Sequence, residues 1–335
     1  MWSQEIRKSF LDFFEKRGHM IVPSSALLSD DPTVLFTTAG MQQFKEYYLG
    51  KSSPYGKKIA SCQKCSRTSD IEEVGDEKHL TFLEMLGNFS FGDYFKKEAI
   101  EWAHELLTST YKLSATSLWI TYFQGDKDIL EDKESQEIWQ KLGIPKEKMH
   151  GFSREDNFWG PTGKEGPCGP TTEIHYELRE TPCELGKKCI PNCECGRFVE
   201  LWNLVFNEYY QNKEKKLTLL KKKGVDTGMG FERLVMVLQK KSSVFETDLF
   251  SSIISQIKEM MRIREVEGSS SFDRLWRPQE AFKKDQERFF QEFKELQYLK
   301  DLRIVADHIK SSVFLTGERV LPSNMEERYV LRRVL

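Results

Sequence analysis

The segment Asp226-Thr-Gly-Met-Gly-Phe-Glu-Arg233 decides the interpretation of this chain, because a glycine turn there runs directly into a helix-like stretch. Glycines let a backbone approach a ligand closely, and Leu234-Val-Met-Val-Leu238 continues as an apolar helical pattern. An Arg one turn into that helix can point back toward the same pocket. Taken alone, these residues also fit a plain glycine turn with a surface Arg, so the segment needs support from elsewhere in the chain.

Two familiar nucleotide-binding loops do not fit this segment. A dinucleotide-binding loop has Gly-x-Gly-x-x-Gly after a strand, whereas position 233 is Arg. The complete P-loop pattern is absent from the sequence as well. If the glycines serve a nucleotide, they belong to another kind of site.

The composition limits the partners of the chain only loosely. Its 335 residues carry a formal net charge of −2, so no overall positive charge points to nucleic acid, although a local patch could bind one folded RNA. No apolar run approaches the roughly 18 residues of a membrane span, and no signal-peptide core is present. We therefore expect a soluble, cytoplasmic protein with no membrane and no DNA partner. A helical pattern still runs at Leu335, and we expect a longer natural protein.

The order of the expected elements indicates an α+β domain followed by a helical one. Alternating bulky side chains predict clear strands at 172–178 and 198–206, and a further short strand at 34–37. We also expect a strand at 118–123, a helix at 99–107 and an exposed charged helix at 126–142. From residue 246 onward the pattern is helical almost throughout. We predict a first domain at 1–245, a Cys-rich insertion within it at about 180–197, and a helical domain at 246–335.

A second group of candidate site residues lies upstream. Arg67 precedes an acidic stretch, and the returning segment carries His79 and Phe82. Two arginines from different segments, Arg67 and Arg233, suit a triphosphate, and an aromatic ring offers a face to a purine. Phe82 equally fits an ordinary core and His79 a structural histidine, so both alternatives stay open.

Four cysteines lie close together at Cys183, Cys189, Cys193 and Cys195. In a cytosolic chain such clustering favours a metal over disulfides, and four thiolates complete a tetrahedral zinc set. The spacing differs from the common paired Cys-x2-Cys arrangement, so free thiols remain an alternative. We predict a closed, structural Zn²⁺ site.

Together these features resemble the class II aminoacyl-tRNA synthetases. The second motif of that class has an Arg, a loop and then His or Arg with Phe, and its third motif is Gly-x-Gly-x-x-Arg opening a helix. Within the class, the chain is similar to the alanyl-tRNA synthetases over essentially its whole length. The matching blocks begin at Ala39, Glu84, Asp156, Gly166, Trp202, Val225, Ala306 and Pro322.

The resemblance implies a fold and a division of labour. It implies an antiparallel sheet flanked by helices for 1–245, as the aminoacylation domain, and the start of a helical tRNA-recognition domain for 246–335. Arg67 would hold the ATP α-phosphate and the amino-acid carboxylate, and Arg233 would pack on the adenine and reach the phosphates. The other implied ATP contacts are His79, Phe82, Gly228 and Gly230, and the implied alanine contacts are Trp159, Asn203, Asp226 and Gly228.

The implied reaction joins alanine and ATP into alanyl-adenylate and pyrophosphate, and then transfers the alanyl group to the 3′ end of tRNA(Ala). No enzyme nucleophile is needed, because alignment and charge stabilisation by Arg67, Arg233 and Mg²⁺ suffice. Asp226 would bind the substrate ammonium, and Trp159 would exclude larger side chains. Steric exclusion cannot keep out glycine, and it discriminates poorly against serine. Full-length members also carry editing and carboxy-terminal domains.

The helical region would contact the acceptor stem of tRNA(Ala). The resemblance implies that Asn324 reads a G·U pair from the wide minor groove of the stem, and Arg328, Arg332 and Arg333 would contact phosphates. Asn324 equally fits a residue that caps the final helix, so this alternative stays open.

Two other functions remain possible. The chain could be another ATP-dependent ligase on a class II core, although Asp226, Asn203 and Trp159 suit a small amino acid. It could also be a non-catalytic RNA-binding module with a decayed site. Retention of both Arg67 and Arg233 together with the glycines argues against decay.

Overall fold

The computed structural model describes residues 1–29, 34–161, 163–179, 183, 189–267 and 283–335. The chain divides into two compact units. The first consists of residues 1–66 and 83–240, and the second of residues 67–82 and 241–335. Parts of the predicted Cys-rich insertion, at 180–182 and 184–188, lie outside the described residues.

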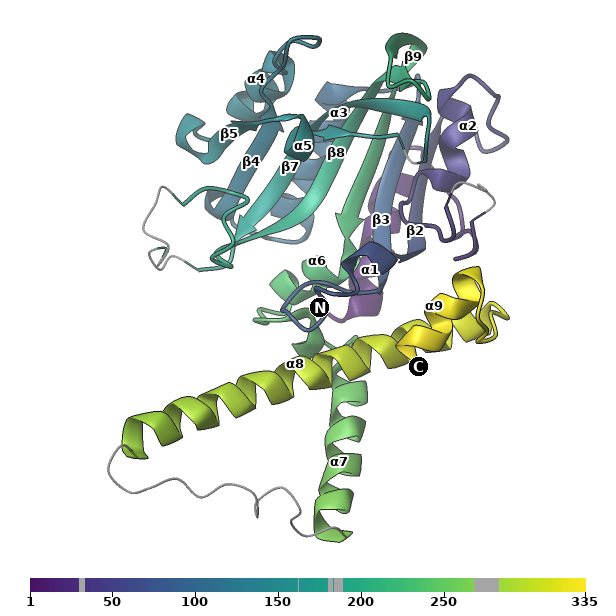
Figure 1. Cartoon of the computed structure of the whole chain (residues 1–335). Coiled ribbons are helices and arrows are strands. Elements are labelled where there is room, and N and C mark those ends of the chain that lie inside the picture. Colours follow the sequence, from purple (N-terminus) through teal and green to yellow (C-terminus); the bar gives the residue numbers. More distant parts are fainter. Residues whose placement is uncertain (30–33, 162, 180–182, 184–188, 268–282) are drawn as a thin grey trace. The chain divides into compact units, whose positions relative to one another are not determined.

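The first unit is built on a mixed, mainly antiparallel sheet (Figure 1). Its strands are β1 (Met20–Ile21), β2 (Lys58–Ser66), β3 (Phe82–Phe91), β4 (Leu118–Phe123), β5 (Met149–Phe152), β6 (Phe158–Trp159), β7 (Gly166–Glu177), β8 (Phe198–Gln211) and β9 (Leu217–Gly230). Among the described residues their order is β1-β2-β3-β9-β8-β7-β4-β5, and β6 pairs with β7. The α+β class is therefore confirmed. Strand β8 contains the predicted strand at 198–206, and β7 contains the one at 172–178 except for its last residue.

The predicted strand at 34–37 is wrong. Only an isolated bridge between Leu28 and Phe36 forms there. Thr37 explains the difference, because its backbone N–H donates to the Leu27 carbonyl at 2.7 Å and its hydroxyl donates to the Ala26 carbonyl at 2.8 Å. Although the Ser66 N–H of β2 also donates to the Thr37 carbonyl at 2.9 Å, no ladder follows from it among the described residues, and the segment remains a loop.

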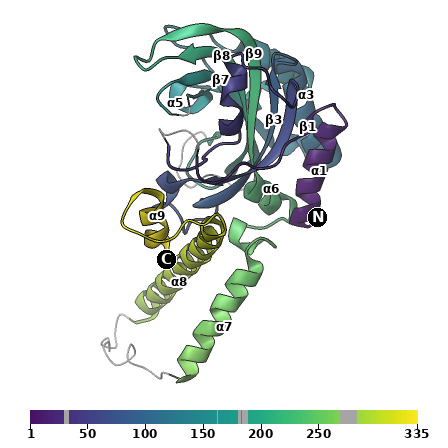
Figure 2. The ribbon, with the colours of Figure 1, turned by 90° about the vertical axis from the view of Figure 1, so that its right-hand side faces the viewer.

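Successive side chains of the central strand β8 point alternately to the two faces of the sheet. Trp202 lies on the face covered by α1 (Ser3–Glu15), with its ring 5.9 Å from that of Phe10. Phe206 lies on the same face, 5.5 Å from Phe95, which precedes α3 (Lys96–Glu105). Figure 2 shows α1 and α3 together on one side of the sheet. Asn203 points to the opposite face.

The remaining helices of the first unit are α2 (Lys45–Tyr48), α4 (Lys133–Lys141), α5 (Arg154–Asn157) and α6 (Phe231–Leu238). Helices α3 and α4 are joined by a buried ion pair, in which Lys96 Nζ lies 2.6 Å from Asp132 Oδ1. Asp132 also caps α4, because its carboxylate accepts the Ser135 backbone N–H. The Asp132 carboxylate therefore caps the N-terminus of α4 and also links this helix to α3.

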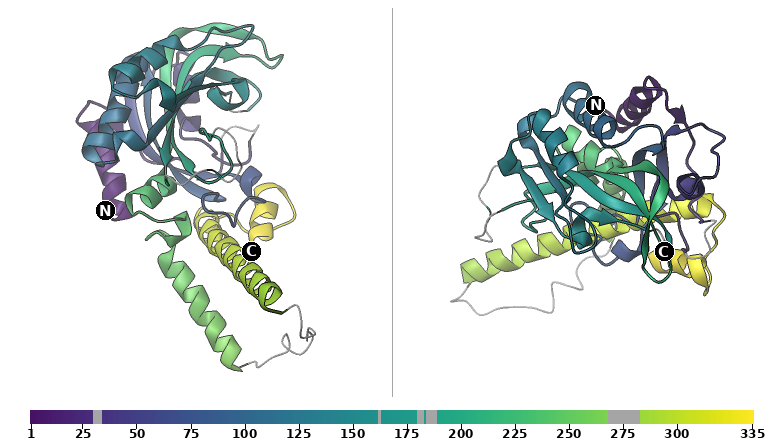
Figure 3. Two further views of the ribbon diagram at one scale, coloured as in Figure 1. Left: turned by 90° about the vertical axis from the view of Figure 1, so that its left-hand side faces the viewer. Right: turned by 90° about the horizontal axis from the view of Figure 1, so that it is seen from above.

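The second unit contains the helices α7 (Ser251–Glu267), α8 (Lys283–Gly317) and α9 (Glu326–Val334). Helix α8 packs against both of the others (Figure 3). The segment 67–82 also packs on α8, where the Thr81 N–H donates to Asp307 Oδ1 at 3.0 Å. The helical character predicted after residue 246 is confirmed. A functional boundary at 245 stays a prediction, and no described helix is long and apolar enough to cross a membrane.

Candidate active site

The glycine segment joins β9 to α6 at Gly230, which is the N-cap residue of the helix. The Arg233 side chain folds back over this residue: a Cβ added at Gly230 would lie 3.3 Å from Arg233 Cδ. Its Nη1 donates to both the backbone carbonyl and the carboxylate of Glu200 on β8, each at 3.2 Å. The Arg thus points back toward β8 and pairs with a carboxylate there, and its contact with a ligand stays a prediction.

Asn203 and Asp226 are diagonal neighbours on one face of the β8–β9 ladder. Asn203 pairs with Gly228, and Val205 pairs with Asp226. Gly228 places no side chain opposite Asn203, and a Cβ there would meet Met85 Sδ at 2.8 Å. The two polar side chains therefore lie on either side of a position where the Met85 side chain packs directly on the glycine backbone, a close approach that only glycine permits.

The carboxyl group of Asp226 is buried, with 5% of the residue exposed. Burial raises the pKa of Asp226 to about 7, because the charged form loses its water. An ammonium group beside it would favour the charged form again. This electrostatic environment suits the amino group of an amino acid.

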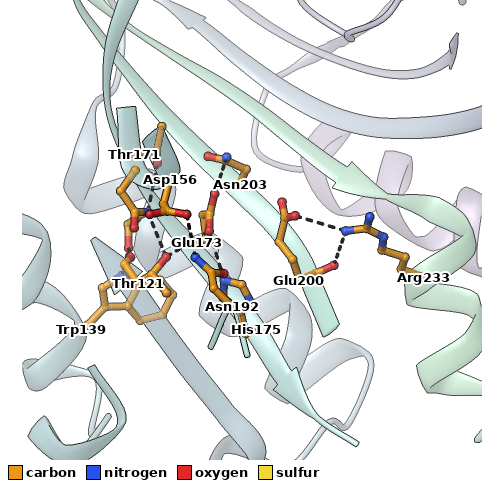
Figure 4. A network of polar contacts seen from close by, with 12 residues as sticks. Thr121, Trp139, Asp156, Thr171, Glu173, His175, Asn192, Glu200, Asn203 and Arg233 are labelled. Carbon is orange, nitrogen blue, oxygen red and sulfur yellow. Dashed lines mark hydrogen bonds and ion pairs between the residues drawn. The ribbon is translucent and has the colours of Figure 1, made fainter. Parts of the chain in front are cut away.

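Asn203 is held in one orientation by a neighbouring carboxylate (Figure 4). Its Nδ2 donates to Glu173 Oε1 at 2.9 Å, and its Oδ1 is buried without a hydrogen-bond partner among the described residues. An unsatisfied buried polar atom costs about 1–3 kcal/mol. A ligand that donates a hydrogen bond to Oδ1 would remove that cost, so the amide is prepared to accept one.

Glu173 lies at the centre of this network, although sequence reasoning did not single it out. It accepts from the Thr121 hydroxyl at 3.1 Å, and His175 Nε2 lies 3.1 Å from its Oε2. Burial raises the pKa of Glu173, and the charge of Glu200 raises it further. One available signal was a carboxylate within a run of otherwise uncharged residues in β7. Glu200 was missed as well, because its pairing with Arg233 depends on the fold.

Trp159 belongs to the cluster beside β9. It packs against a group of buried side chains that includes Phe44 and Tyr48. The Tyr48 hydroxyl donates at 2.7 Å to the carbonyl of Val225, the residue before Asp226. The structure therefore gathers Trp159, Asn203, Asp226 and Gly228 within the first unit, around neighbouring strands.

The three upstream candidates Arg67, His79 and Phe82 lie in the second unit. Both ring nitrogens of His79 face carboxylates, with Nδ1 2.6 Å from Asp76 and Nε2 3.1 Å from Glu73. The Phe82 ring is buried and stacked on Phe314, with centroids 3.9 Å apart. The Arg67 backbone N–H donates to Thr81 at 2.9 Å. A role for these residues in binding ATP stays a prediction, and adenine stacking would require a free face on Phe82.

The four clustered cysteines lie between the paired ends of β7 and β8. Their sulfur atoms all lie within 4.8 Å of one another, with 3.7 Å between Cys183 and Cys193 and 3.5 Å between Cys189 and Cys195. A tetrahedral site with metal–sulfur distances of about 2.3 Å separates its sulfurs by about 3.8 Å. Four thiols in this arrangement could hold one metal ion.

The predicted tRNA contacts lie around α9. Nη1 of Arg332 donates to Oδ1 of Asn324, and Arg328 Nε lies 3.9 Å from Glu327. The N-cap of α9 is Met325, which makes no side-chain cap hydrogen bond. Asn324 therefore does not cap the helix, and the structure joins two of the candidate residues in one exposed contact.

Comparison with known proteins identifies the family. The family model described as tRNA synthetases class II (A) matches residues 5–335. The alanine–tRNA ligase of Rubrobacter xylanophilus is 46% identical over 343 residues, covering 100% of this chain and 36% of the relative. That of Thermotoga maritima is 46% identical over 338 residues, covering 100% of this chain and 35% of the relative.

These relatives are much longer than the chain, which spans about a third of the length of the curated relatives it matches. Among solved structures, S. aureus histidyl-tRNA synthetase aligns with 71% of this chain and 65% of its own, at 12% identity and a TM-score of 0.43. That likeness is too distant to bear on function. The match over residues 5–335 is sufficient, and the chain belongs to the class II (A) family of tRNA synthetases.

Proposed function

We propose that the chain activates alanine with ATP and transfers the alanyl group to the 3′ end of tRNA(Ala). One observation carries the proposal: the buried carboxylate of Asp226 and the unpartnered Oδ1 of Asn203 flank Gly228 on one face of the sheet. The relatives named alanine–tRNA ligase align with the whole of this chain and support the choice of amino acid. Such synthetases act where tRNA is charged, which favours a cytoplasmic location.

The chemistry follows from this arrangement. The alanine ammonium would pair with Asp226 and donate to Asn203, which leaves the alanine carboxylate free to attack the α-phosphorus of ATP. Pyrophosphate would then leave, and a ribose hydroxyl of the tRNA would attack the acyl carbon and release AMP. Arg233, and Arg67 as the resemblance implies, would stabilise the charge on the phosphates. Gly228 and Gly230 would let the backbone approach the ligands.

Mg²⁺ is expected to accompany ATP, and one carboxylate suits it. Oxygen ligands are what Mg²⁺ prefers, and it is usually bound through phosphates with one or two carboxylates. Glu200 is partly exposed beside Arg233, with 37% of its side chain accessible. We propose Glu200 as a protein ligand for Mg²⁺, which would supply charge neutralisation on the phosphates when bound.

Zinc is the metal that best fits the four thiols. Zn²⁺ binds four cysteines in structural sites, and sulfur separations of 3.5 and 3.7 Å match such a tetrahedron closely. We propose Cys183, Cys189, Cys193 and Cys195 as its ligands. Zinc analysis of freshly purified protein should give close to one equivalent, and a value below about a tenth of an equivalent would contradict the site.

Amino-acid-dependent pyrophosphate exchange tests the proposed activity. The chain should exchange pyrophosphate into ATP most efficiently with alanine, and less efficiently with serine and glycine. Replacing Arg233 with Ala should abolish the exchange, because charge stabilisation at the phosphates is lost. The variant Lys141→Ala, which removes an exposed positive charge at the end of α4, is the matched control and should retain full activity.

The same assay separates the alternatives. Exchange driven by a different carboxylic acid would favour another ligase of this class. A complete absence of exchange with preserved tRNA binding would favour an RNA-binding module. Full activity in Arg233→Ala would show that this Arg does not serve the reaction.

A further inference from the structure

The cysteine cluster carries a residue that reaches toward the proposed alanine site. Asn192 stands between Cys189 and Cys193 in a tight turn, where the Cys193 N–H donates to the Ile190 carbonyl at 3.1 Å. Its φ is +71°, a left-handed conformation that Asn tolerates better than most residues. Two metal ligands flanking this turn would fix its direction. We call Cys183 and residues 189–195 the cysteine knuckle.

From the knuckle, Asn192 contacts the segment that leads to Trp159. Its Nδ2 donates to Asp156 Oδ1 at 3.1 Å. Asp156 lies in α5, and α5 runs directly into β6, which ends at Trp159. The knuckle and the predicted wall of the alanine pocket are therefore connected by one hydrogen bond and three residues of chain.

A polar chain continues from α5 to the proposed amino-acid ligand. Asn157, the residue after Asp156, is buried and its Nδ2 donates to Thr121 Oγ1 at 2.9 Å. The Thr121 hydroxyl donates to Glu173 at 3.1 Å, and Glu173 accepts from Asn203 at 2.9 Å. Figure 4 shows Asn192 beside Asp156 at one end, and Thr121, Glu173 and Asn203 toward the other. Each member is positioned by the next.

We infer that a metal ion in the cysteine knuckle positions Asp156–Trp159 through Asn192, and thereby sets the affinity of the site for alanine. The inference rests on the proposed function for the identity of the ligand. Asn192 is a positioning residue, since it touches neither substrate nor reacting atoms. The effect should fall on alanine and spare ATP, because the contacts lead to Trp159 and Asn203.

The size of the effect is limited by other anchors on α5. Arg154 pairs with Asp126 at 2.6 Å and lies 4.2 Å from the centre of the Phe158 ring. Asn157 is held separately, because its Nδ2 donates to the hydroxyl oxygens of Thr121 and Thr171. Loss of a single hydrogen bond typically changes an equilibrium between about two- and tenfold. We expect a rise of that size in the alanine KM.

The variant Asn192→Gly tests the inference without disturbing the turn. Glycine accepts the left-handed φ and all four thiols remain, so the zinc content should equal that of the parent. The alanine KM should rise about two- to tenfold, with the ATP KM and kcat unchanged. Lys215→Gly, at another left-handed position with φ +62° in the β8–β9 turn, is the matched control. It should change nothing.

A double-mutant cycle identifies the contact responsible. Asp156→Ala should raise the alanine KM to a similar extent, and adding Asn192→Gly to it should have no further effect. Asp156→Asn keeps an accepting oxygen and should restore a value close to that of the parent. Strict additivity of the two changes would mean that the residues act independently, and would overturn the inferred path.

Metal affinity gives a readout that does not depend on catalysis. If the metal and alanine favour the same conformation, each must increase the affinity of the protein for the other. The two factors must be equal, because binding coupling is reciprocal. Zinc competition with a chromogenic chelator, under reducing conditions, should therefore shift about two- to tenfold when alanine is added. In Asn192→Gly this shift should vanish while zinc still binds.

The possible failures are distinguishable. A parent protein without alanine-dependent exchange would refute the proposed function. A parent that is active, with an unchanged alanine KM in Asn192→Gly, would refute the coupling alone. Equal rises in the alanine and ATP KM values would also refute it, because general loosening of the fold would then explain the change.

Discussion

Asp226 is a buried carboxylate that lowers the stability of the fold when ionised, at a position where we propose that substrate binds. Its carboxylate is buried in the β8–β9 ladder, where we propose that it binds the substrate ammonium, and the loss of its water disfavours the charged form. The pKa of Asp226 is about 7 in the folded chain, compared with an ordinary value of 3.8. Between these values the folded chain holds a proton that the unfolded chain has released. The free energy of unfolding must therefore fall as the pH rises across this range.

We predict that Asp226→Asn removes most of this dependence. The rise of about three units in the pKa of Asp226 corresponds to on the order of 4 kcal/mol. This is the largest amount by which the ionised carboxylate can lower the free energy of unfolding above pH 7. Urea unfolding at pH 5 and pH 8 measures the difference. Asp307, whose pKa burial raises to about 6, contributes with the same sign, so Asp307→Asn should flatten only the lower part of the range.

The same variant should lose alanine-dependent exchange at neutral pH, because an amide cannot neutralise the substrate ammonium. In the parent, kcat/KM for alanine should decline as the pH falls below about 7, since this ratio reports ionisation in the free enzyme. An unchanged pH slope of stability in Asp226→Asn would show that another group titrates in this range.

Candidate site residues that belong to one short sequence motif could be predicted from the sequence, whereas those that depend on contacts between distant strands could not. Asp226, Gly228 and Arg233 belong to one short motif and could be named together. The partners Glu173 and Glu200 were not found, because their roles depend on which strands lie side by side and in what register. Phe82 shows the reverse case, since its motif is local but its packing on Phe314 is not.

At the scale of elements, the same distinction explains which helices and strands were predicted. The strand at 118–123 and the helix around residues 99–107 have clear periodic patterns, and both are found. The charged helix expected at 126–142 is shorter, because Asp132 caps it and it begins at Lys133. Asp126 holds the preceding residues in a loop by accepting the backbone N–H groups of Asp128 and Ile129. A continuous polar pattern could not reveal that boundary.

The joint between α3 and α4 gives a prediction at this scale. Lys96 is buried between Asp132, Glu134 and Glu208, at 2.6, 3.7 and 3.6 Å. Lys96→Met should lower the free energy of unfolding by about 3–5 kcal/mol, because Asp132 would remain buried without a counter-charge. Denaturant unfolding measures this loss.

An exposed lysine in a comparable pair provides the control. Lys8 pairs with Asp12 one turn away on α1, and 73% of its side chain is exposed. Lys8→Met should have no measurable effect, since exposed pairs contribute little. Equal losses in the two variants would mean that burial of the pair is unimportant.

At the scale of the whole molecule, the second unit is proposed to recognise tRNA. Asn324 and Arg332 are in contact beside α9, where Arg328 is also exposed. We predict that Arg328→Gln and Arg332→Gln weaken binding of tRNA(Ala) and each lower the salt dependence of log Kd by about one. Filter binding between low and moderate salt measures the slope, and Asn324→Ala should weaken binding without changing it. Weakening that does not depend on salt would contradict phosphate contacts for the two arginines.

The packing of residues 67–82 on α8 also has a consequence for how the protein is made. The hydrogen bond between Thr81 and Asp307 joins residues 226 positions apart. At a synthesis rate of about 5–20 residues per second, roughly 10–45 s pass between the emergence of one partner and the other. During that interval Phe82 has no Phe314 to stack on. The nascent chain therefore exposes residues 67–82 before the helix α8, on which they pack, has been synthesised, and a chaperone that binds apolar segments could bind them in that interval.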